Sequence, residues 1–229
     1  MKVGINLIGV SKDPDNGSRR LINWILTYYR LKQRVIDCWI EQGHEVFIYI
    51  TTYNTNENQY IIDSFQKITP NPIKYQIIDD YNTHRMYTQK IGHELLRNEN
   101  LDIVVDTKFE IIFHKNITEY DIKYDKFNVL FKEDVFYNSI DDELTCDAIF
   151  IYPYSMLEDL ILLCEKYYNI FKDPKYNGYN GDMHKFYKEI KDTKGEEFVN
   201  LMTNDRCLSF NDYHQTHYTL IRLPLNGLF

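Results

Sequence analysis

Three charged side chains, Asp106, Lys108 and Glu110, lie two residues apart within the largely apolar segment 101–116. If this segment is one strand, all three point to the same face, because side chains alternate along a strand. A charge directed into a sheet–helix interface is costly, so we expect the end of this strand to face a polar cleft. A surface ion pair between Lys108 and Glu110 is the alternative.

The chemistry that these residue types support is the binding of phosphate. Asp106 and Glu110 would hold a divalent cation, Mn or Mg, which neutralises a pyrophosphate. Lys108 would contact a phosphate directly. Whether the metal or the cations Lys108 and Arg85 carry the phosphate is left open by the sequence.

The segments on either side alternate between strand and helix patterns. Buried strands are expected at 2–10, 44–54, 73–82 and 101–116, and helices at 19–43, 56–68 and 83–100. Further strands are expected at 126–134 and 146–153, and further helices at 155–171 and 182–192. Alternation of this kind predicts an α/β fold: a single domain over residues 1–229 with a mainly parallel central sheet and helices on both faces.

Ligands of such sheets bind beyond the carboxyl ends of the strands. Four residues at the ends of the first two strands, Gly9, Val10, Thr51 and Tyr53, are therefore expected to line a polar ligand. Arg85, near the start of a helix, would reach a pyrophosphate or a sugar. An ordinary loop tyrosine and a solvated helix arginine are the alternatives for Tyr53 and Arg85.

Composition excludes several classes of protein. The net charge of −8 argues against binding of nucleic acid, which needs a basic face. Neither GxxxxGK[ST] nor GxGxxG is present, so a P-loop NTPase and a Rossmann oxidoreductase lose support. No apolar run reaches the length of a membrane span, and residues 1–10 lack the features of a signal peptide, so we expect a cytoplasmic protein.

Several short motifs resemble one group of enzymes in their order along the chain. The run Thr107-Lys108-Phe109-Glu110-Ile111-Ile112-Phe113 is similar to the [ST]-R-F-D-I-x-F strand end of glycosyltransferases from large DNA viruses and bacterial polysaccharide clusters. The segment 81–91 resembles their N-x-x-R helix start, through Asn82 and Arg85. The segment 182–190 resembles their D-x-H helix, through Asp182 and His184. Lys108 stands where a DxD motif has its second Asp.

The resemblance implies a Rossmann-like fold of the glycosyltransferase A type, in which Gly9, Val10, Thr51 and Tyr53 would surround the base and ribose and Tyr53 would stack on the base. Residues 1–115 would form the half that binds the nucleotide sugar and residues 116–229 the acceptor side. The implied enzyme moves a sugar from a UDP- or GDP-sugar to a glycan or other hydroxyl acceptor, in the host cytoplasm if the protein is viral. Asp182 is the candidate base or acceptor-binding residue and His184 the second candidate. A catalytically silent glycan- or nucleotide-binding module is the alternative, and a nucleotidyltransferase is a third possibility.

Overall fold

A computed structural model describes residues 1–9, 20–21, 24–80, 84–133, 144–172, 183–207, 216–220 and 223–224. Its strands are β1 (Lys2–Ile8), β2 (Arg20–Leu21), β3 (Glu45–Tyr53), β4 (Lys74–Ile78), β5 (Ile103–Thr107), β6 (Ile111–Phe113), β7 (Phe127–Val129), β8 (Lys132–Glu133), β9 (Ile149–Pro153), β10 (Val199–Leu201), β11 (Arg206–Cys207), β12 (Tyr218–Leu220) and β13 (Leu223–Pro224). Its α-helices are α1 (Trp24–Leu31), α2 (Asp37–Glu41), α3 (Asn58–Gln66), α4 (Arg85–Glu94), α5 (Leu157–Lys172) and α6 (Phe186–Lys194). The π-helical turn η1 (Lys32–Ile36) joins α1 to α2, and short 3₁₀ turns are η2 (Ile117–Glu119), η3 (Tyr154–Met156), η4 (Met183–Lys185) and η5 (Glu196–Phe198).

The centre of the molecule is a seven-stranded sheet in the order β10-β7-β9-β5-β1-β3-β4. β1 lies parallel to both β3 and β5, and β3 lies parallel to β4. β9 is the exception: it inserts antiparallel between β5 and β7. The predicted α/β fold with a mainly parallel sheet is therefore confirmed.

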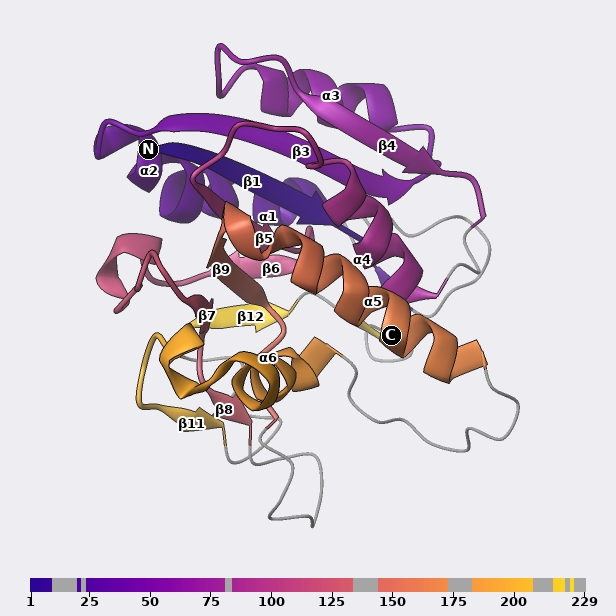
Figure 1. Ribbon diagram of the computed structural model, residues 1–229. Coiled ribbons are helices and arrows are strands. Elements are labelled where there is room, and N and C mark those ends of the chain that lie inside the picture. Colours follow the sequence, from indigo (N-terminus) through magenta and orange to yellow (C-terminus); the bar gives the residue numbers. More distant parts are fainter. Residues whose placement is uncertain are drawn as a thin grey trace.

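Helices cover both faces of this sheet, as predicted (Figure 1). One core joins alternate residues of β1 and β5, such as Val3, Ile5 and Val105, to α1, α2 and α3. The other core packs Val104 and Phe150 against α4, α5 and α6. β1 is buried on both faces, which explains its nearly continuous apolar sequence.

The segment 101–116 is not one strand, contrary to prediction. β5 ends at Thr107, Lys108–Glu110 form a turn, and β6 starts at Ile111 and pairs with β12 instead of the central sheet. The turn breaks the alternation of side chains, so Asp106, Lys108 and Glu110 do not share a face. The helix expected at 19–43 is divided by the π turn η1, and the strand expected at 126–134 is divided into β7 and β8.

Candidate functional site

A charged cluster lies at the carboxyl edge of the sheet, where β5 ends. Lys108 follows the last residue of β5, and its Nζ lies 2.6 Å from Oδ2 of Asp147. Asp147 precedes β9, and because β9 is antiparallel to β5, the start of β9 lies at the end of β5. His184, in η4, completes the cluster with its Nε2 3.6 Å from the same Asp147 oxygen.

The backbone between these elements holds His184 in one orientation. The amide of Thr145 donates to the carbonyl of His184 over 2.9 Å, and Nδ1 of His184 lies 2.8 Å from the carbonyl oxygen of Thr145. A carbonyl oxygen only accepts, so Nδ1 carries a proton and donates it. This bond assigns the tautomer and turns Nε2 toward Asp147.

The cluster has an excess of positive charge within an acidic protein. Burial by itself would raise the pKa of Asp147, but the charges of Lys108, His184 and Arg85 and the hydrogen bond from Lys108 hold that pKa well below its usual range. One carboxylate thus faces two permanent cations, Lys108 and Arg85, and a histidine. The Lys108 and Asp147 side chains are largely buried and keep only 15% and 14% of their surface exposed. An arrangement of this kind attracts and binds an anion such as a diphosphate.

Three of the predicted site residues, Lys108, Arg85 and His184, are therefore brought together around Asp147. Asp147 itself was missed from the sequence. A charged residue directly before a buried strand was its only local signal. Asp182 and Val10 lie outside the described residues.

Asp106 lies in a different, buried polar network on the α4 side of the sheet. Its side chain accepts hydrogen bonds from Asn6 Nδ2 (2.7 Å), His93 Nε2 (2.6 Å) and Tyr152 OH (3.0 Å). The residue is only 2% exposed. Burial, and then the Asp106 charge and hydrogen bond, raise the pKa of Tyr152 well above its usual value. Asn6, His93 and Tyr152 were not singled out from the sequence.

Close packing of α4 makes this network possible. A Cβ on Gly92 would lie 2.6 Å from Cδ1 and 2.8 Å from Cγ1 of Ile8 in β1. The missing side chain lets α4 approach the sheet, and the next residue, His93, reaches Asp106. On its other side, His93 Nδ1 lies 3.6 Å from Cys164 Sγ in α5.

The side chains of Asp106 and Glu110 do not fit the metal site that the sequence predicts. Asp106 is enclosed by hydrogen-bond donors, and Glu110 is also buried. Across the parts of the chain that the structure describes, no group of three or more His, Cys, Asp or Glu side chains is arranged to hold a metal ion.

The remaining predicted residues lie near the ends of β1 and β3. Gly9 has a φ of 115°, its amide donates to the carbonyl of Thr51 over 2.9 Å, and a Cβ built on it would meet open space. Thr51 is buried, and its hydroxyl has no hydrogen-bond partner among the described residues. Tyr53 is also buried, and its hydroxyl shares a 2.7 Å hydrogen bond with Thr88 of α4. Their role in binding a nucleotide stays a prediction.

The fold is similar to that of a solved structure. The chain is similar in structure to a nucleoside-diphosphate-sugar pyrophosphorylase from Vibrio cholerae RC9, with a TM-score of 0.51 and 8% sequence identity over 91% of this chain and 93% of that one. No protein-family model and no curated protein matches the sequence. At this identity the likeness establishes the α/β fold over almost the whole chain. Within the described residues, no helix is long and apolar enough to span a membrane.

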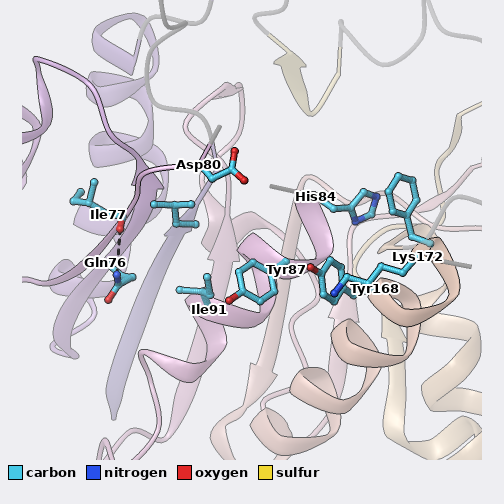
Figure 2. A pocket seen from close by; sticks show the side chains of 10 residues that line it. Gln76, Ile77, Asp80, His84, Tyr87, Ile91, Tyr168 and Lys172 are labelled. Carbon is cyan, nitrogen blue, oxygen red and sulfur yellow. Dashed lines mark hydrogen bonds between the residues drawn. The ribbon is translucent and has the colours of Figure 1, made fainter. Parts of the chain in front are cut away.

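A pocket of about 600 Å³ lies between β4, α4 and the end of α5 (Figure 2). Its lining combines the aromatic rings of His84, Tyr87, Tyr168 and Phe171 with the polar side chains of Gln76, Asp80 and Lys172. His84 is the N-cap residue of α4, and its ring accepts from the amide of Met86. Arg85 is the next residue, so the start of α4 contributes to both the pocket and the cluster.

Proposed function

We propose that this protein is a glycosyltransferase that moves a sugar from a nucleotide-diphosphate sugar to a hydroxyl acceptor. The observation that carries the proposal is the cluster of Lys108, Arg85 and His184 around Asp147 at the carboxyl edge of the sheet. Ligands of open α/β sheets bind at this edge. The structural neighbour, named for its action on nucleoside-diphosphate sugars, supports a nucleotide sugar as the ligand.

In the proposed reaction, the acceptor oxygen forms a bond to the anomeric carbon while the bond from that carbon to the diphosphate oxygen breaks. The nucleoside diphosphate leaves with the bonding electrons. Lys108 and Arg85 stabilise the negative charge that develops on it, which is the electrostatic contribution expected of preorganised cations. Asp147 holds the Lys108 ammonium group in place through the 2.6 Å contact.

The proton of the acceptor hydroxyl needs a base. We assign it to the deprotonated form of His184: Nδ1 donates to Thr145, so the lone pair of the neutral ring lies on Nε2. The protonated ring that results is the form whose charge lowers the pKa of Asp147. Asp182, two residues earlier in the chain, remains the alternative base.

Two measurements test the proposal. The first is thermal melting with UDP, GDP and CMP, each with and without Mn²⁺, on the wild-type protein, Lys108→Met and Lys74→Met. Lys74 is the matched control, since it is also paired to a carboxylate, Glu99, but lies on β4, which β1 and β3 separate from β5. Loss of a charged hydrogen bond predicts that Lys108→Met weakens binding of the preferred diphosphate by about 10- to 100-fold, whereas Lys74→Met binds normally.

The second measurement follows turnover. With UDP- and GDP-sugars and a mixture of glycan acceptors, the wild-type protein should release nucleoside diphosphate and His184→Gln should release far less. Unchanged binding in Lys108→Met, or the absence of any nucleotide-dependent melting shift, refutes the proposal. Binding without release of diphosphate supports a silent binding module instead.

A second candidate is a nucleotidyltransferase, which the structural neighbour favours. Such an enzyme joins a sugar 1-phosphate to a nucleoside monophosphate unit and releases pyrophosphate from a nucleoside triphosphate. Incubation with each nucleoside triphosphate and several sugar 1-phosphates, followed by a pyrophosphate assay, separates the two reactions. Release of inorganic pyrophosphate without release of a nucleoside diphosphate identifies nucleotidyl transfer.

A further inference from the structure

The pocket between β4, α4 and α5 has rigid aromatic walls. Tyr87 is 38% exposed and Phe171 is 52% exposed, so both rings have surface that a ligand can cover. The ring of His84 stacks on Phe171 with a centroid distance of 3.7 Å, and Tyr87 packs against Tyr168 at 5.1 Å. These contacts hold the rings in position before a ligand arrives, which lowers the entropy cost of binding.

The polar groups of the pocket balance in charge. Figure 2 shows Gln76 of β4 on one side, Asp80 above the hollow, and Lys172 of α5 on the other side. Lys172 Nζ lies 4.1 Å from the centre of the Tyr168 ring, a cation–π contact. One acid and one amine give no net charge, in contrast to the cationic cluster around Lys108. A diphosphate is therefore favoured at the cluster and an uncharged ligand in the pocket.

A sugar ring has the two surfaces that this lining would match. Its C–H face is apolar and packs on an aromatic ring, while its hydroxyl groups donate to carboxylates and amides and accept from amines. The pocket volume of about 600 Å³ is within the usual range for small-ligand sites. The aromatic rings, the amide of Gln76 and the charges of Asp80 and Lys172 thus suit a neutral saccharide.

We propose that this pocket binds a sugar unit of a neutral oligosaccharide and that this oligosaccharide is the acceptor. The term acceptor rests on the proposed function; the binding of sugar does not. The link between the two sites is the start of α4, where His84 lines the pocket and Arg85 contributes its charge to Asp147.

Saturation-transfer NMR tests the proposal with four trisaccharides: maltotriose, cellotriose, mannotriose and triacetylchitotriose. We expect at least one to receive magnetisation from the wild-type protein. Tyr87→Ala and Phe171→Ala should each raise its dissociation constant by about tenfold or more, because each removes an aromatic wall. Tyr75→Ala is the matched control: Tyr75 is an exposed ring on β4 next to Gln76 but faces the opposite side of the sheet.

The outcomes separate this proposal from the proposed function. Loss of sugar binding in Tyr87→Ala, with the melting shift by nucleoside diphosphate unchanged, supports a distinct saccharide site. Sugar binding without any response to nucleotides supports the pocket and refutes the glycosyltransferase. Absence of a signal from all four trisaccharides, or an equal signal from wild type and both pocket variants, overturns the saccharide site whatever the nucleotide result.

Discussion

Replacement of Asp106 by alanine should destabilise the protein strongly. The change leaves three buried donors, Asn6 Nδ2, His93 Nε2 and Tyr152 OH, without their acceptor. Removal of one member of a buried, charged hydrogen-bonded group costs about 3–5 kcal/mol. A domain is stable by about 5–15 kcal/mol, so we expect Asp106→Ala to lose a large part of its stability or to fail to fold.

Asp106→Asn keeps the shape of the side chain and should cost less, about 1–3 kcal/mol. Urea unfolding followed by circular dichroism measures both values, provided that the slope with denaturant stays unchanged. Asp121→Ala is the control, because Asp121 is an exposed aspartate and its loss should leave the midpoint where it is.

The same variant decides between the structural and metal-binding interpretations of Asp106. If Asp106 serves the buried network, Asp106→Asn unfolds at lower urea and Mn²⁺ shifts its midpoint no differently from that of wild type. If Asp106 holds a metal, the variant keeps the wild-type midpoint in the absence of metal and loses only the stabilisation by Mn²⁺. The second result would refute our account of the network.

Two further predictions concern the charged cluster and the packing of α4. Cations lower the pKa of Asp147 in the folded protein, so its contribution to stability is complete above the unfolded value of about 3.9 and is lost as the pH falls toward the lower folded pKa. In an acid titration, the unfolding free energy of Asp147→Asn should therefore decline less steeply below about pH 4 than that of wild type. Equal slopes would contradict this. Gly92→Ala places a Cβ within 2.6 Å of Ile8 and should lower the free energy of unfolding, measured in urea, by about 1–3 kcal/mol. Ile8→Ala makes room for this methyl group, so the double variant should lose less unfolding free energy than the sum of the two single variants.

The sequence by itself determined the order of the elements and, with it, the edge of the sheet where the site lies. Period-two and helical patterns are local properties, and their alternation implies parallel strands joined by crossover helices. Parallel strands end at one edge, which pointed to Lys108 at the end of β5. Arg85 and His184 were predicted from the resemblance of their motifs to those of glycosyltransferases, without knowledge of any contact between the three residues. The contacts of each of these residues could not be predicted from the sequence, because residues 85, 108 and 184 are far apart in the chain.

The tertiary structure decided the rest, and strand direction was the physical reason. No local pattern states that β9 inserts antiparallel beside β5, yet this insertion brings Asp147 to Lys108. The turn at Lys108–Glu110 was hidden because the apolar sequence continues through it into β6, which pairs with β12 from far along the chain. Asp106 was read as a cleft residue because a buried charge is costly. Its partners on β1, α4 and β9 offset that cost, and only the folded chain brings Asn6, His93 and Tyr152 together around it.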